Sequence, residues 1–262
     1  MKKLLNRYVG LCRCELQRLL CDKKVYICFF MYLFVCLFAV RLETNLTESG
    51  IGAFAILTGI SNMSNLLELI AAFPTVMSFC DDISGKYYMP LVMRSNKSSY
   101  IFSKIFICIN STFWISFTAL IAFQLISTMR GGLGIESMFP GIMFYDVVHS
   151  NMPYLIIIIQ AFLFSIVQAV YAVMGLAIAS YIPNRFVAVT APFVVMVVMQ
   201  IINGFLPKVL DLYRIRSVHS IGTGISSGMY IVYAVMVTTG YIILAGLVFS
   251  RRVGRRLRNE II

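Results

Sequence analysis

Charged residues are scarce in this chain of 262 residues. They make up 13% of the sequence, whereas hydrophobic residues make up 60% and the mean hydropathy is +0.86. A soluble domain carries about 25% charged residues, so the composition excludes an ordinary soluble globular protein. The sequence also lacks the alternation of apolar and polar residues over about 10 positions that marks a membrane barrel strand. It therefore predicts an all-α membrane protein.

Motifs of several enzyme classes are also missing. The two histidines, His149 and His219, fall in predicted outer loops, and no HExxH motif of a metalloprotease occurs. Neither the phosphate-binding loop GxxxxGK followed by Ser or Thr nor the nucleophile motif GxSxG is present. Cys12 and Cys14 form only a C-x-C pair, too little for a zinc site. We expect no enzyme activity, metal or cofactor in this chain.

Long apolar runs are abundant. A helix needs about 20 apolar residues to cross a bilayer, and six candidate spans fit this length approximately: 25–40, 61–79, 105–127, 154–182, 186–205 and 229–250. The spans and their connections use up the chain, so we predict a single transmembrane domain over residues 1–262. Small residues at helical spacing in the fourth span predict close helix packing: Ser165, Ala169, Ala172, Gly175 and Ala179.

The net charge of +11 would suggest nucleic acid as the partner of a soluble protein, but the basic residues follow the predicted spans. Seventeen of the 22 Lys and Arg residues precede the first span, lie between spans two and three or four and five, or follow span six. Basic residues accumulate on the cytoplasmic side, so we expect both termini there, with residues 251–262 as a basic tail. Five basic residues fall on the outer side: Arg41, Arg130, Lys208, Arg214 and Arg216.

Two further helices are predicted outside the spans. Residues 1–24 place Leu5, Leu16 and Leu20 on one face and Lys3 and Arg18 on the other, which is typical of an amphipathic helix at the membrane surface. Residues 206–228 mix apolar and basic residues, which predicts a short interfacial or partly re-entrant helix before the last span.

One acidic residue, Glu68, falls inside a predicted span. Asn65 and Asn62 precede it on the same helix face. A polar stripe in a span is costly unless it faces protein or water, so Asn65 and Glu68 are candidates for a substrate or ion pathway. The interpretation we favour is a helix start, with Ser61 or Ser64 as N-cap and Glu68 close to water.

The connection between spans two and three is the most polar interruption in the first half of the chain. Asp82 follows the span, Gly85 allows the chain to bend, and Pro90 suits the first turn of a new helix. Arg94 and Lys97 then add basic charge. This segment, residues 80–104, predicts a short cytoplasmic helix that crosses the ends of two spans and presents charge to water. An ordinary basic loop is the alternative.

The same segment resembles the permease subunits of ABC transporters of the ABC-2 type. Members carry an acidic residue after the second span, then a glycine, an apolar stretch, a polar and basic turn, an aromatic residue and a Ser-Lys pair before the third span. The corresponding residues here are Asp82, Gly85, Leu91 to Met93, Ser95 to Lys97, Tyr100, and Ser103 with Lys104. Asn96-Lys97 stands where an arginine is usual, and Pro90 interrupts the apolar stretch.

The resemblance implies a coupling helix that sits in a groove of a separate P-loop ATPase. It implies two ATPase copies that bind ATP and Mg, and a second permease copy in a homodimer or heterodimer. Together they would export an amphipathic cargo, such as an antimicrobial peptide, a drug or a lipid, across a bacterial cytoplasmic membrane by alternating access. The residues it assigns to coupling are Asp82, Gly85, Pro90, Arg94, Lys97, Tyr100 and Lys104.

Two other functions stay open. An ion-coupled secondary transporter would use Glu68, although the two halves of the sequence show no convincing repeat of the kind common in such proteins. A membrane-integral immunity or binding protein would need no transport at all.

Overall fold

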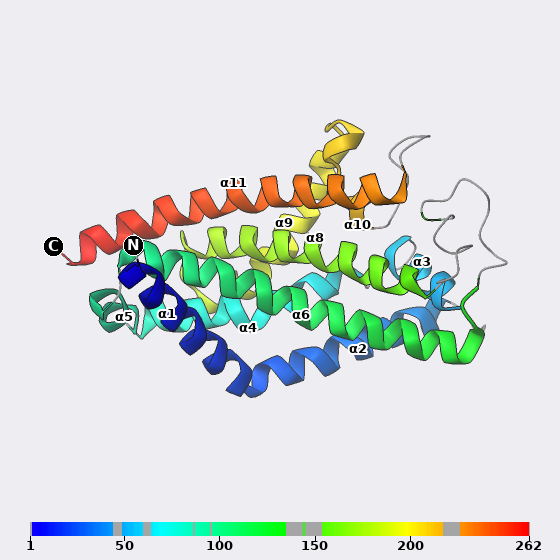
Figure 1. Ribbon diagram of the computed structural model, residues 1–262, viewed down its shortest axis with the longest axis horizontal. Coiled ribbons are helices and arrows are strands. Elements are labelled where there is room, and N and C mark those ends of the chain that lie inside the picture. Colours follow the sequence, from blue (N-terminus) through cyan, green and yellow to red (C-terminus); the bar gives the residue numbers. More distant parts are fainter. Residues whose placement is uncertain are drawn as a thin grey trace.

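Helices account for nearly all of the described chain. The computed structural model describes residues 2–43, 49–59, 64–85, 87–94, 96–134, 144, 154–216 and 226–261, and no strand occurs among them. The helices are α1 (Lys2–Cys21), α2 (Lys23–Glu43), α3 (Gly50–Gly59), α4 (Ser64–Ser84), α5 (Tyr88–Arg94), α6 (Lys97–Gly131), α8 (Leu155–Ala179), α9 (Arg185–Asn203), η2 (Lys208–Leu210), α10 (Leu212–Arg216) and α11 (Ser227–Ile261). The longest helices run side by side along the long axis of the molecule (Figure 1).

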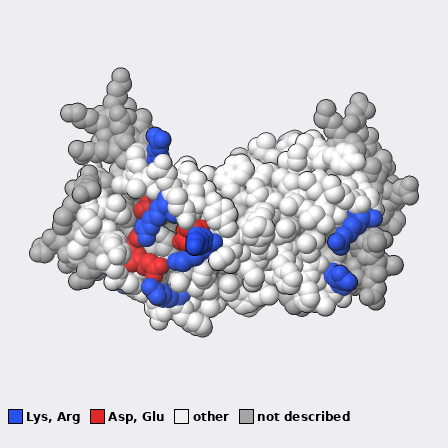
Figure 2. Space-filling model, turned by 90° about the horizontal axis from the view of Figure 1, so that it is seen from below, with Lys and Arg blue, Asp and Glu red and all other residues white. Residues whose placement is uncertain are grey.

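Five helices of the described chain are long and apolar enough to cross a membrane. They cover Lys23–Leu42, Lys97–Gly131, Leu155–Ala179, Arg185–Asn203 and Ser227–Arg258. On the face in Figure 2, basic and acidic residues gather toward one end of the molecule, basic residues alone appear at the other end, and a broad band without charged residues lies between. The predicted class, an all-α multi-pass membrane protein, is confirmed at this level.

Helix α4 is not among these five, although it has 21 residues. Its sequence contains Glu68 near the start and Asp81 and Asp82 near the end, which lower its apolar character. The second predicted span, 61–79, corresponds to the larger part of this helix. Residues 61–63 of that prediction lie outside the described part of the chain.

Helix α8 forms the centre of the bundle and packs against α4, α6, α9 and α11. Its small residues Ser165, Ala169, Ala172 and Ala179 are fully buried. Gly175 faces α9, where a Cβ atom would lie 2.5 Å from Cγ of Pro192. The prediction that small residues let helices pack closely within the chain is therefore confirmed.

Gly175→Ala should lower the stability of the protein by about 1–3 kcal/mol, because the added methyl group collides with the ring of Pro192. Thermal unfolding of the purified protein in detergent measures this loss. Gly240→Ala in α11 is the matched control, since a Cβ there meets no heavy atom within 4 Å. The control should unfold at the wild-type temperature or slightly above it, because alanine favours a helix. Equal melting temperatures for the two variants would contradict the packing argument.

One end of the molecule carries most of its charge, and we call it the basic end. It contains α5, the start of α6, the charged helix α1 and the last turns of α11 (Figure 1). Helix α1 turns into α2 at Asp22, whose carboxylate accepts a hydrogen bond from the Lys24 amide at 3.0 Å. The predicted basic tail continues α11 as helix to Ile261.

The chain between α9 and α11 leaves the bundle and returns to it. The segment after α9 projects sideways (yellow in Figure 1), and η2 follows. Helix α10 then packs against α8 and α9 and buries Leu212, Ile215 and Arg216. A short helix thus occurs in the predicted segment 206–228, and residues 217–225 of that prediction lie outside the described chain.

Candidate functional site

The predicted connection between spans two and three is largely helical. Helix α4 continues to Ser84, where the Gly85 amide donates to the Asp81 carbonyl at 2.9 Å, and α5 occupies Tyr88–Arg94. Tyr88 and Val92 are buried in an apolar cluster that includes Phe79, so one face of α5 is anchored to the bundle. Tyr87 is 63% exposed just before it, and Pro90 is exposed on it. Helix α5 lies at the outer edge of the basic end (Figure 1).

Asp82 lies at the centre of an ion cluster formed by Glu15, Arg18, Asp82 and Lys104, which we call the Asp82 cluster. Glu15, Asp82 and Lys104 are buried, whereas the Arg18 side chain is 49% exposed. Asp82 is fully buried, with Oδ1 2.7 Å from Nη1 of Arg18 and Oδ2 2.5 Å from Nζ of Lys104. Lys104 is 5% exposed and lies 2.8 Å from Oε2 of Glu15. The two acidic and two basic side chains together carry no net charge, and their mutual attraction offsets the free-energy cost of removing these charges from water. The cluster joins α1, α4 and α6.

Arg18 shows how strongly this arrangement favours the charged state. Burial lowers the pKa of the Arg18 guanidinium, but the hydrogen bond and the negative charge of Asp82 raise it, and the net direction is upward. The negative charge of Asp82 therefore favours the charged form of Arg18.

A more exposed set of ion pairs surrounds the cluster. Asp81 accepts from Nη2 of Arg185 at 2.9 Å and lies 3.7 Å from Nζ of Lys24, which ties α4 to α9 and α2. Figure 2 shows acidic and basic residues around a hollow at this end of the molecule. The hollow is lined by Glu15, Arg18 and Lys104 together with residues of α4 and α8.

The structure changes the predicted role of several coupling residues. Asp82 and Lys104 are buried and join helix ends, so they do not present charge to water as the sequence suggested. Tyr100 is buried as well. Gly85 and Pro90 are exposed and Lys97 is partly exposed, while the side chain of Arg94 lies outside the described part. On α1, Arg18 contacts Asp82, whereas Leu16 and Leu20 are 40% and 52% exposed.

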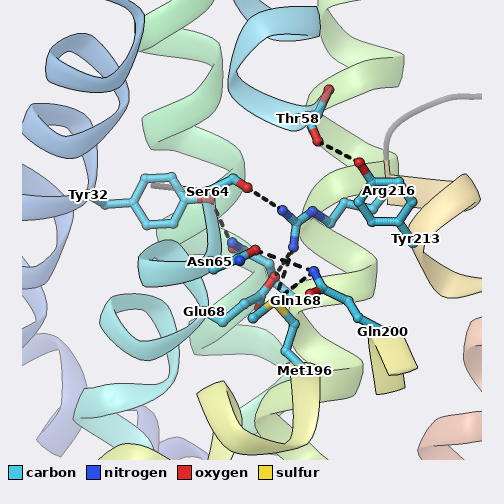
Figure 3. A network of polar contacts seen from close by, with 10 residues as sticks. All are labelled: Tyr32, Thr58, Ser64, Asn65, Glu68, Gln168, Met196, Gln200, Tyr213 and Arg216. Atoms are coloured by element: carbon cyan, nitrogen blue, oxygen red, sulfur yellow. Dashed lines mark hydrogen bonds and ion pairs between the residues drawn. The ribbon is translucent and has the colours of Figure 1, made fainter. Parts of the chain in front are cut away.

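A second polar group lies deep in the bundle, at Glu68 (Figure 3). Oε1 of Glu68 is 3.4 Å from Nη1 of Arg216, and both side chains are 1% exposed. Nη2 of Arg216 donates to Oγ of Ser64 at 2.6 Å, and the guanidinium lies 5.0 Å from the ring centre of Phe164. This ion pair connects α4 to α10, and Phe164 of α8 packs against the Arg216 guanidinium.

Other polar side chains extend this group, which we call the Glu68 network. Tyr32 donates to Gln168 at 3.0 Å, linking α2 to α8. Gln200 of α9 donates to Asn65 at 3.4 Å, and Figure 3 shows these residues arranged around the ion pair. The network therefore connects α2, α4, α8, α9 and α10.

Two sequence-based interpretations are corrected here. Ser64 does begin α4, but Glu68 is not close to water, because α8 and α10 cover it. Arg216, counted among the basic residues of the outer side, is buried in the bundle as the partner of Glu68. Glu15 was not singled out at all. The sequence offered one sign of its role, because Glu15 is an acidic residue within an otherwise basic helix.

The fold defines the class of the protein, a multi-pass all-α membrane protein. Two ion groups join its helices: the Asp82 cluster at the basic end and the pair of Glu68 and Arg216 inside the bundle. No protein-family model, curated protein or solved structure matches the chain.

Proposed function

We propose that this chain is the permease subunit of an ATP-driven ABC exporter. The observation that carries the proposal is α5. It is a short helix with one face anchored by Tyr88 and Val92 and the other face open at the basic end. A helix of this kind, held rigidly and exposed on one side, suits a groove on an ATPase subunit. In this proposal the basic end is cytoplasmic, and α4 completes a set of six spans.

The Asp82 cluster would carry motion from α5 into the bundle. Helices α4 and α6 flank α5, and their ends are joined by the buried pair of Asp82 and Lys104. A push on α5 therefore moves both helices together, and Glu15 and Arg18 make α1 follow. The resulting rotation of two permease copies would alternate access for an amphipathic cargo such as a peptide, a drug or a lipid.

Replacing residues 85–97 by a Gly/Ser linker of equal length should abolish association with the ATPase, because the anchored helix is lost. The measurement is co-purification of the tagged permease with a P-loop ATPase co-expressed from the neighbouring gene. The single changes Tyr87→Asp and Pro90→Asp should weaken association without removing the helix, since both side chains are exposed.

Phe205→Asp is the matched control, because Phe205 is also exposed, at 89%, but lies after α9. It should leave association intact. Undiminished association of the linker variant, in protein that is inserted in the membrane, would refute the role of α5. Normal transport with no ATPase bound would refute the proposed function as a whole.

An ion-coupled secondary transporter is the second candidate, and the buried acid Glu68 is the observation that favours it. Transport by the purified chain in vesicles, driven by a proton gradient and lost in Glu68→Gln, would support that function. A non-transporting immunity protein would instead remain active beside an ATPase that cannot hydrolyse ATP.

A further inference from the structure

A groove runs between the start of α6 and the last turns of α11, with a volume of about 520 Å³. We call it the basic groove. Its lining residues are Lys97, Ser98, Ile101, Phe102, Ser250, Arg251, Gly254, Arg255 and Arg258. Four of these residues are cationic, two carry hydroxyl groups, and none of the described lining residues is acidic.

The arginines reach this groove because of their spacing on α11. Arg251, Arg255 and Arg258 recur at helical intervals, while Val253 and Leu257 on another face are 4% and 3% exposed and pack into the apolar cluster of the basic end. No described carboxylate forms an ion pair with Lys97 or with the three groove arginines. The groove therefore gathers positive charge that the described protein leaves unneutralised.

The neighbouring arginines of α11 are used differently. Arg252 lies 4.8 Å from the ring centre of Tyr181, outside the groove lining. Arg256 is half-buried, has contacts of its own and does not line the groove either. The tail thus divides into arginines that line the groove and arginines on another face of the helix, which have contacts of their own.

Exposed apolar side chains continue the groove toward the uncharged band. Phe102 and Phe106 follow Ser98 on α6 and are 60% and 46% exposed. Leu244 and Leu247 precede Arg251 on α11 and are 62% and 48% exposed. A ligand that fits both parts has an anionic head and an apolar tail.

We propose that the basic groove binds the phosphate headgroup of an anionic phospholipid, with its acyl chains along the exposed side chains of α6 and α11. Arginine and lysine bind phosphate oxygens by charge-assisted hydrogen bonds. The exposed hydroxyl group of Ser98 adds an uncharged donor, whereas Ser250 donates to the Leu247 carbonyl at 3.0 Å. Basic pockets between membrane helices suit such headgroups. The proposal is independent of the proposed transport function.

Native mass spectrometry of the full chain in detergent tests this site. Phosphatidylglycerol should bind more tightly than phosphatidylcholine with the same acyl chains. The double variant Arg255→Gln/Arg258→Gln should bind phosphatidylglycerol roughly 30-fold more weakly, the effect of two basic residues at a charged membrane surface. Arg255→Lys/Arg258→Lys, which keeps both charges, should retain most of the binding and shows that the segment folds.

The matched control is Arg252→Gln/Arg256→Gln, which removes the same charge from the same helix but not from the groove. It should bind phosphatidylglycerol like wild type. An equal loss in both glutamine variants would overturn the proposal, because it would indicate general surface charge. Equal binding of the two lipids to wild type would also overturn it. Displacement of the lipid by millimolar inorganic phosphate would show a site for soluble anions, and would equally overturn a lipid site.

Discussion

Arg216→Met should lower the stability of the protein by about 3–5 kcal/mol, the usual cost of breaking a buried ion pair. Arg216 and Glu68 are each 1% exposed, so the carboxylate of Glu68 would be left in the bundle without its cation. The substitution also removes the hydrogen bond to Ser64. Thermal or denaturant unfolding in detergent measures the change.

Two controls separate lost charge compensation from lost volume. The double variant Glu68→Leu/Arg216→Met removes both charges and should recover most of the stability, because apolar replacement of a buried pair is often neutral or stabilising. Arg214→Met should cost much less, since Arg214 is one third exposed and pairs with Asp211 on neighbouring turns. A double variant as unstable as Arg216→Met would contradict the ion-pair argument.

Asp82→Ala should have an effect of similar size, about 3–5 kcal/mol, because it removes the shared acid of the Asp82 cluster. Lys104 is 5% exposed and would keep only Glu15 as a partner, while Arg18 would lose its partner. We expect α1 to lose its ion pair with α4 and to become more mobile, although Glu15 and Lys104 still join it to α6. Unfolding in detergent and the rate of tryptic cleavage within α1 measure the two effects.

The adjacent residue provides the control. Asp81→Ala removes pairs with Arg185, which is 69% exposed, and Lys24, which is 42% exposed. Exposed pairs contribute about 0–1 kcal/mol, so this variant should remain close to wild type with α1 in place. Similar losses for the two aspartates would show that burial of Asp82 does not determine its importance.

The spans were the predictable part of this protein, because membrane crossing depends on local composition and length. Pro74 stands inside α4 and Pro192 inside α9, yet the apolar runs around them still identified both helices. Asp82 and Lys104 were both selected from the sequence as residues of one segment. Their burial was not predictable, since it depends on Glu15 and Arg18 of a distant helix.

Arg216 illustrates the limit most clearly. It lies 148 positions from Glu68 in sequence, in a segment that counts as an outer connection by charge and hydropathy. Only the return of α10 into the bundle places the two together. A local pattern cannot reveal such a pair. The one available hint was that Glu68, alone within a span, requires a cation from somewhere.

Helices α6 and α11 have 35 residues each. At about 1.5 Å per residue each is about 50 Å long, whereas the hydrocarbon core of a bilayer is about 30 Å thick. Both helices are therefore longer than the hydrocarbon core and extend beyond it. An unbroken helix transmits tilt along its length. A ligand that holds α6 and α11 together at the basic groove would therefore also restrict how far the opposite ends of the two helices can separate.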